Sequence, residues 1–271
     1  MIIGIDIGST TTKAVSLEEG GIIRKIKTRA EDAITSATGA FGKMIVENGI
    51  KMSEIKRIMI TGAGATKIDG ELFGIPTEKV SEIKAIGTGG MFLSRQDNII
   101  LANIGTGTAI IEARKDRITH LGGSGVGGGT ILGLAKKLLS LSDFKDVMEL
   151  AVSGNLDPVD LLMEDIMVMD LGFLNNKSTA SNFGKMLDTA RNEDIALGII
   201  NMVYQVIGML AVFAARSRNI GKVIVTGSGS HNPLGQKILA EITNMHSIAF
   251  EYPEDAEYTT AVGAGLCGVK I

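Results

Sequence analysis

The chain has 271 residues, more than a single hydrophobic core usually serves, so we expect two domains of ordinary size. Its formal net charge of -3, with Lys and Arg scattered along the sequence, argues against a nucleic-acid-binding surface. The single cysteine, Cys267, excludes an internal disulfide and a cysteine-rich metal site, which is typical of a reducing compartment. The N-terminal residues lack the pattern of a signal peptide, so we expect a cytoplasmic protein that acts on small molecules.

The first predicted strand, residues 2–7, ends in a turn rich in Gly, Ser and Thr. This segment, residues 4–15, reads GIDIGSTTTKAV, and a second of the same kind, residues 103–113, reads NIGTGTAIIEA. Each joins two hydrophobic strands through a turn whose backbone N–H groups and hydroxyls can bind phosphate oxygens. One such turn could be an ordinary hairpin, but the repetition indicates two half-domains that face one nucleotide.

Two further predicted strands, residues 55–60 and 222–226, also run into glycine-rich turns. Ligands of open α/β sheets bind at the carboxyl ends of strands, so the strand-to-glycine junctions near residues 8, 62, 105 and 227 predict one shared cleft. Each junction taken alone could be a simple turn. Strands alternate with helices, as in layered α/β proteins, and the shorter helices are expected over residues 30–48, 81–93, 130–139 and 142–154.

A third glycine-rich segment, residues 122–130, reads GGSGVGGGT and leads straight into a predicted helix. Glycines let the backbone approach a ligand, and the start of the helix points unpaired N–H groups and its positive dipole end at the loop. The segment therefore predicts an anion site, although a hinge between domains would use similar glycines. It is not a Walker motif, because Lys136 lies six residues after Thr130, and it lacks the glycine spacing of a dinucleotide-binding fold.

An uncharged helix is predicted over residues 195–215, and it is long enough to cross a bilayer. Asn201 and Tyr204 near its middle make a membrane span unfavourable, and an apolar helix can equally be buried between domains or subunits. Gly198 and Gly208 would permit close helix approach. We therefore expect a homodimer that uses this helix, and no membrane partner.

Several motifs keep a characteristic order along almost the whole chain, from residue 4 to residue 266. The most specific are GGGTILGL at residues 127–134, SDFKDVMELAVSGN at residues 142–155 and TASNFGKM at residues 179–186. Together with GIDIGSTTTKAV, TGAGATK, SEIKAIGTGG, NIGTGTAI and AVGAGL, they resemble the type II pantothenate kinases. The opening motif alone is shared with the wider superfamily of acetate and sugar kinases, heat-shock chaperones and actin.

The resemblance implies an α/β fold of two duplicated ribonuclease-H-like domains, as in the actin-like ATPases, with a nucleotide cleft between them. We expect the N-terminal domain over residues 1–100 and the C-terminal domain, with the dimerisation helix, over residues 101–271. It also implies that the chain uses ATP and Mg²⁺ to phosphorylate pantothenate to 4'-phosphopantothenate, the first step of coenzyme A biosynthesis.

The same resemblance assigns residues to the nucleotide. Asp6 matches the carboxylate that positions Mg²⁺, commonly through water, and Lys13 supplies positive charge near the transferred phosphoryl group. The other expected contacts are small residues of the two turns, the glycine loop and the last junction: Gly8, Ser9, Thr10, Thr11, Gly105, Thr106, Gly107, Gly127, Gly128, Gly129 and Gly227.

Glu82 is the expected catalytic base. An acceptor hydroxyl is a poor nucleophile while it keeps its proton, so a carboxylate within hydrogen-bond reach is required. Glu82, in SEIKAI, matches the family's base and contacts the acceptor. An alternative is that Ser81 and Glu82 merely begin a helix, with a serine cap and an acid in the first turn.

Three further positions match the family's acceptor site: His120, Gly125 and Tyr258. His120 stands where the family usually has an arginine, and a histidine is a weaker and titratable partner for an anion. Arg117 lies three residues earlier and could compensate. The identity of the acceptor is therefore less firmly implied than the reaction class.

Two other functions remain open in the sequence. The opening motif also resembles the ATP-dependent activators of 2-hydroxyacyl-CoA dehydratases, but these need cysteine ligands for an iron–sulfur cluster, and Cys267 alone gives a dimer two thiolates. A kinase of a related small molecule, or a catalytically silent ATP-binding regulator, would use the same fold.

Overall fold

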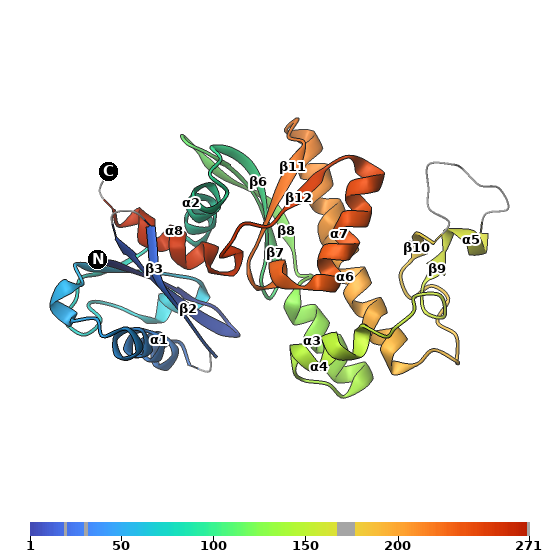
Figure 1. The fold of residues 1–271 in the computed structure, drawn as a ribbon, viewed down its shortest axis with the longest axis horizontal. Helices are drawn as coiled ribbons and strands as arrows, with labels where there is room; N and C mark the ends of the chain where they lie inside the picture. Colours follow the sequence, from blue (N-terminus) through green and yellow to red (C-terminus); the bar gives the residue numbers. More distant parts are fainter. Residues whose placement is uncertain (19–20, 30–31, 167–176, 270–271) are drawn as a thin grey trace.

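Two five-stranded sheets with flanking helices form the body of the molecule (Figure 1). The computed structural model describes residues 1–18, 21–29, 32–166 and 177–269. The sheet orders are β3-β2-β1-β4-β5 and β8-β7-β6-β11-β12, each with three antiparallel strands followed by two parallel ones. The predicted duplication is therefore confirmed. The strands are β1 (Ile2–Ile7), β2 (Thr11–Glu18), β3 (Gly21–Arg29), β4 (Arg57–Thr61), β5 (Thr77–Lys79), β6 (Asn98–Ile104), β7 (Thr108–Arg114), β8 (Ile118–Ser124), β11 (Lys222–Thr226) and β12 (Ala249–Glu251).

Strand β1 illustrates why the first sheet is covered on both faces. Its alternate residues Ile3, Ile5 and Ile7 are fully buried in one core cluster together with residues of α1 (Ala33–Asn48). Gly4 faces the opposite side, where a Cβ would lie 2.1 Å from the carbonyl oxygen of Ala261. A helix backbone therefore lies directly on the sheet at this point.

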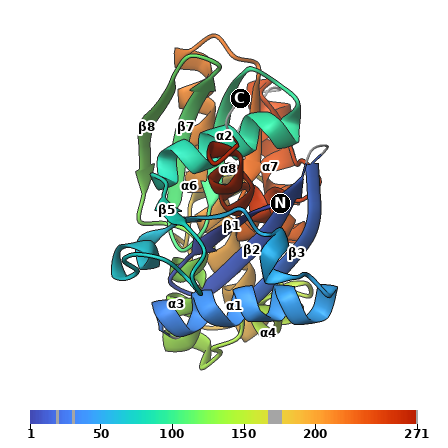
Figure 2. The same ribbon diagram turned by 90° about the vertical axis from the view of Figure 1, so that its left-hand side faces the viewer.

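The remaining helices form two groups. Helices α2 (Glu82–Ser94) and α8 (Thr259–Cys267) lie between the two sheets, α2 on β6, β7 and β8 and α8 on β1, β2 and β4 (Figures 1 and 2). The far side of the second sheet is covered by helices that share one large core cluster. These are α3 (Gly128–Leu139), α4 (Phe144–Ala151), α6 (Asn192–Ser217) and α7 (Pro233–His246).

Helices α2 and α8 cross where each carries a glycine. A Cβ on Gly263 would lie 1.8 Å from the carbonyl oxygen of Ala85, and one on Gly89 would lie 2.0 Å from that of Thr259. The chain thus exchanges helices between its halves, since α2 precedes residue 100 yet lies on the second sheet, while α8 returns to the first. The domain limits 1–100 and 101–271 stay a prediction.

Helix α6 is the core helix of the second half. By length and hydropathy it could cross a membrane, yet half of its 26 residues are buried within the chain. Our reason for expecting a subunit contact at Gly198 and Gly208 was wrong, because both glycines serve packing inside the chain. Gly198 makes room for Val159, and Gly208 for Ile242.

An excursion between α4 and α6 contains β9 (Leu161–Leu162), α5 (Met163–Ile166) and β10 (Thr179–Ser181), and it projects away from the body (Figure 1). The fully buried Asp160 holds it to α6. Its carboxylate accepts hydrogen bonds from Thr179 Oγ1 at 2.9 Å, Phe183 N at 2.9 Å and Asn201 Nδ2 at 2.8 Å. The motif TASNFGKM, which contains Thr179 and Phe183, is therefore anchored to the core.

Candidate functional site

The two predicted phosphate turns lie face to face. In each hairpin the first glycine of the turn donates to a carbonyl near its end: Gly8 N to Thr11 O at 3.1 Å, and Gly105 N to Gly107 O at 2.9 Å. Ser9 Oγ and Thr106 Oγ1, one from each turn, lie 2.7 Å apart. The turns therefore form opposite walls of one site.

The glycine loop before α3 supports the second turn. Gly128 N donates to Gly105 O and Gly129 N to Thr106 O, both at 2.9 Å, and a Cβ on Gly127 would lie 2.7 Å from Thr106 O. Our expectation that the start of this helix offers unpaired N–H groups to an anion is wrong for these two groups, because carbonyls of the turn already accept them. The glycines are needed so that the helix backbone can approach the turn.

The other two strand-to-glycine junctions are structural copies of one another. Gly62 follows β4 with φ +87° and ψ 170°, and Gly227 follows β11 with φ +83° and ψ 178°. A side chain is excluded at both, since a Cβ would lie 2.7 Å from Ile7 O or 2.5 Å from Ile104 O. These junctions bring the ends of β4 and β11 against Ile7 and Ile104, the residues directly before the two phosphate turns.

A cleft of about 890 Å³ runs between the halves, and most of the predicted site residues line it. The structure brings together two acids, one lysine and the small residues of four segments: the two turns, the glycine loop and the junction after β11. These residues are Asp6, Gly8, Ser9, Thr10, Thr11, Lys13, Glu82, Gly105, Thr106, Gly107, Gly128, Gly129 and Gly227. Among the residues that the structure describes, Gly127, His120, Gly125 and Tyr258 do not line this cleft.

Asp6 and Lys13 face each other across the β1–β2 pair, where they are register partners. Burial raises the pKa of Asp6 to about 7, with Lys13 opposing the shift and Glu82 adding to it. Lys13 is 5% exposed, and burial lowers its pKa while Asp6 and Glu257 raise it. Its Nζ donates to Ser228 Oγ at 2.7 Å, so it reaches from the first half to the second. The cleft thus holds a poorly solvated lysine beside a buried acid.

Glu82 is the first residue of α2 and lies on the cleft wall. Desolvation by the surrounding protein raises its pKa above the ordinary glutamate value. Ser81 occupies the cap position, but its side chain makes no capping hydrogen bond. The alternative that Ser81 caps the helix is therefore not supported. The raised pKa of Glu82 suits a group that must accept a proton near neutral pH.

The residues expected at the acceptor lie around the cleft rather than in its walls. His120 is exposed on the edge strand β8 opposite Ile111, which is buried in the cluster beneath α2, so His120 shares the face of the sheet that carries Glu82. Tyr258 packs beside Val15 and Leu17 of β2, and burial raises its pKa to about 12. Gly125 is exposed. The roles assigned to these three residues stay predictions.

The donor set of the cleft fits a hydrated divalent cation. In the described ranges no group of three His, Cys, Asp or Glu residues could enclose a metal ion. Mg²⁺ usually keeps several waters and binds through one or two carboxylates together with phosphates. Asp6 supplies one carboxylate, and its register partner Thr61 has a buried hydroxyl that forms no hydrogen bond within the described part of the chain.

Sequence reasoning missed several cleft residues, among them Lys27, Asn103, Tyr204 and Ser228. Asn103 occupies in the second half the place that Asp6 has in the first, and it accepts a hydrogen bond from Thr226 Oγ1 at 3.0 Å. The parallel between DIG and NIG in the repeated turns could have identified it. Tyr204 donates to Gly229 O at 2.7 Å. Lys27 and Ser228 reach the cleft through strand register and the crossing of the chain between the halves, and the sequence shows neither.

Comparison with known proteins points to one family. Residues 98–266 match the model of the Fumble family. The type II pantothenate kinase of Bacillus cereus is 32% identical over 274 residues, covering 97% of this chain and 96% of that protein. The type II pantothenate kinase of Staphylococcus aureus is 28% identical, covering 99% of this chain and all of that protein.

Solved structures of low identity share the fold. The activator of 2-hydroxyisocaproyl-CoA dehydratase from Clostridium difficile, with bound ADPNP, has a TM-score of 0.69 at 19% identity and covers 98% of this chain and 93% of that one. The ROK family glucokinase of Streptomyces griseus, with glucose and AMPPNP, has a TM-score of 0.61 at 16% identity, with 98% of each chain covered. The predicted duplicated α/β fold is confirmed by this likeness.

Proposed function

The chain belongs to the Fumble family, together with the type II pantothenate kinases, and on this premise we propose that its cleft transfers the terminal phosphoryl group of ATP to pantothenate. The product is 4'-phosphopantothenate. The observation that carries the proposal is the meeting of Asp6, Lys13 and Glu82 in one cleft with two facing phosphate turns. We further propose that the protein acts in the cytoplasm.

In this proposal each charged group has one task. Glu82 accepts the proton of the acceptor's primary hydroxyl as the oxygen attacks phosphorus. Lys13, held by Ser228, stabilises negative charge on the phosphate oxygens. Asp6 would hold Mg²⁺ through its water shell, and the bound cation would neutralise charge on the phosphate chain. The turns at residues 8–11 and 105–107 orient the phosphates between them.

The activator alternative is supported by the opening motif and by the shared fold. Cys267, the single cysteine of the chain, lies at the end of α8, with Thr88 Oγ1 3.9 Å from its Sγ. This cysteine lies outside the glycine loop at residues 122–130, where the resemblance to the activators would require a cluster ligand, and it does not line the cleft. A kinase acting on an acceptor related to pantothenate remains the stronger second candidate.

The test is acceptor-dependent release of ADP from the purified protein. With MgATP present, pantothenate is expected to stimulate release strongly, while pantoate, pantetheine and sugars are compared beside it. Glu82→Gln serves as the matched inactive control. Release of ADP without any acceptor would favour an ATPase. Stimulation by a sugar and not by pantothenate would show that the acceptor is a sugar.

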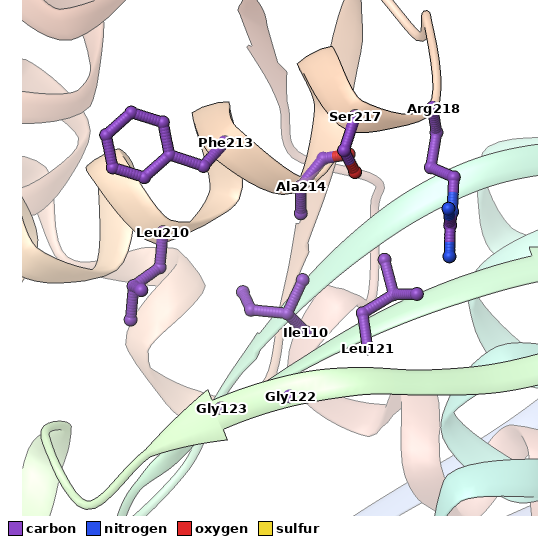
Figure 3. A pocket seen from close by; sticks show the side chains of 9 residues that line it. All are labelled: Ile110, Leu121, Gly122, Gly123, Leu210, Phe213, Ala214, Ser217 and Arg218. Carbon is purple, nitrogen blue, oxygen red and sulfur yellow. The ribbon is translucent and has the colours of Figure 1, made fainter.

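We also propose a homodimer through the exposed side of α6. Met202, Val206, Met209 and Phe213 follow one another at intervals of four, three and four residues, and none of them is fully buried. A cavity of about 330 Å³ lies beside this stripe, between α6 and the edge strand β8, and Phe213 projects at its border with 58% of its surface exposed (Figure 3). Two-fold pairing would let Phe213 of each copy enter the cavity of the other, which supports a self-complementary contact.

A further inference from the structure

A second lysine stands beside Lys13 on the cleft wall. Lys27 of β3 is the register partner of Lys13 on β2, so the two side chains share one face of the sheet. Both residues line the cleft. Like charges directly opposite each other destabilise a strand pair, so this arrangement requires an anionic partner.

Glu257 provides that partner from the second half of the molecule. Lys27 Nζ donates to Glu257 Oε2 at 2.9 Å, and the side chains are 41% and 18% exposed. Although burial opposes it, the pKa of Glu257 is lowered by its hydrogen bond to Lys27 and by the charges of Lys27, Lys13 and His231. Glu257 therefore pairs with Lys27 and also faces the charge of Lys13, whose other acidic neighbour is Asp6.

We infer that Lys27 is a second cationic ligand for the phosphate chain of the nucleotide, and that Glu257 holds this lysine in place until phosphate replaces it. The inference rests on the proposed kinase function. The phosphate chain carries several anionic oxygens, and it offers Lys27 charge-assisted hydrogen bonds that compete with the one carboxylate to which Lys27 is bound.

The sheet order decides which ligand Lys27 contacts. In the order β3-β2-β1-β4-β5, Lys27 lies on one side of the first phosphate turn, while Glu82 follows β5 on the other side. Lys27 is therefore separated from the expected position of the acceptor hydroxyl. Its loss should weaken nucleotide binding and leave acceptor binding unchanged.

The chain contains a matched control on the same strand. Lys25 Nζ lies 2.5 Å from Asp255 Oδ1, with side-chain exposures of 39% and 21%. This pair joins the same two segments as the Lys27–Glu257 pair, yet among the described residues neither Lys25 nor Asp255 lines the cleft. Removing Lys25 thus removes an equivalent cross-link without touching the site.

The experiment measures binding of a fluorescent MgATP analogue to the full chain, together with KM for ATP and for pantothenate. Lys27→Gln is expected to raise the Kd and the ATP KM about tenfold, with the pantothenate KM unchanged. Lys25→Gln should stay within about twofold of wild type while losing similar thermal stability. Glu257→Gln should bind nucleotide at least as tightly as wild type, because it frees Lys27.

Equal effects of Lys27→Gln and Lys25→Gln on nucleotide affinity would overturn the inference and make Lys27 a structural cross-link. Weaker nucleotide binding by Glu257→Gln, to the same extent as by Lys27→Gln, would do so as well. A wild-type protein that binds no nucleotide would overturn the proposed function together with the inference. Normal nucleotide binding without pantothenate-dependent turnover would remove only the proposed acceptor.

Discussion

At the scale of single residues, the cleft combines two acids whose environments differ. Asp6 is enclosed by β1, β2 and β4 beside Lys13, while Glu82 begins a helix at the cleft wall. Both pKa values are raised, that of Asp6 to about 7. The charge of Lys13 favours the charged form of Asp6, whereas no such lysine acts on Glu82, whose pKa is raised by desolvation alone.

Replacement of Glu82 by Gln tests its role as base. The amide keeps the size of the side chain but cannot accept the proton, so turnover is expected to fall by about two to four orders of magnitude with nucleotide binding retained. Stopped assays of ADP release and nucleotide titrations measure the two effects. Glu78→Gln on β5, outside the cleft lining, is the control. Turnover within a few-fold of wild type would make Glu82 a helix-start residue only.

The residues that the sequence placed in the cleft are those whose position is local. Asp6, Gly8 and Glu82 line the cleft, and a turn or a helix start fixes the position of each, while their roles stay predictions from the family resemblance. Lys27 was not recognised, since its place beside Lys13 depends on the register of two strands. The glycine loop was misjudged for a related reason, because its N–H groups find carbonyl partners in a turn more than twenty residues earlier in the chain.

At the scale of elements, the predicted strands and helices are mostly present, with shifted ends. The helix expected from residue 30 begins at Ala33, because the side chain of Asp32 accepts from Thr35 N and caps it. The helix expected from residue 130 begins at Gly128, where the second phosphate turn takes up the first N–H groups. Hydrogen-bond partners set these boundaries, and local helix propensity does not predict such partners.

The start of α6 provides a prediction about pH. Asp194, with its side chain 3% exposed, accepts hydrogen bonds from Arg191 and from Asn155 N, and these contacts lower its pKa to about 2. The charged form therefore stabilises the fold above about pH 4, and this contribution is lost as the pH falls toward 2. Asp194→Asn should lower the free energy of unfolding at pH 7 by about 2 kcal/mol.

Urea unfolding at several pH values measures this effect. The difference between wild type and Asp194→Asn should shrink below pH 3, whereas the exposed Asp188→Asn should change stability little at any pH. A difference that persists unchanged at pH 2 would mean that packing, and not charge, makes Asp194 important.

The crossing of α2 and α8 provides a second prediction at this scale. Gly263→Ala would place a Cβ 1.8 Å from the backbone of Ala85, so the helices must separate. We expect a loss of about 3 kcal/mol, or roughly 6–12 °C in Tm. Gly39→Ala in α1 has nothing within 4 Å and should instead gain up to about 1 kcal/mol. Similar melting temperatures for the two variants would contradict close contact of α2 and α8.

At the scale of the whole molecule, the proposed dimer can be tested without disturbing the cleft. Phe213→Asp places a charge in the partly exposed stripe of α6, and it should convert a dimer into a monomer as measured by sedimentation or light scattering. Val46→Asp in α1, where Val46 is 81% exposed, is the control that should leave the mass unchanged. A monomeric wild-type protein, or a Phe213→Asp variant that stays dimeric, would show that this face of α6 is not the subunit contact.

The return of α8 to the first sheet also sets the order in which the protein can be completed during translation. The strands of the first sheet leave the ribosome early, yet the helix that covers the face with Gly4 is encoded at residues 259–267. At typical rates of synthesis, the nascent sheet waits roughly ten to forty seconds with that apolar face uncovered. The N-terminal half is made first and finished last, so a chain released before α8 leaves both halves open and exposed to chaperones and proteases.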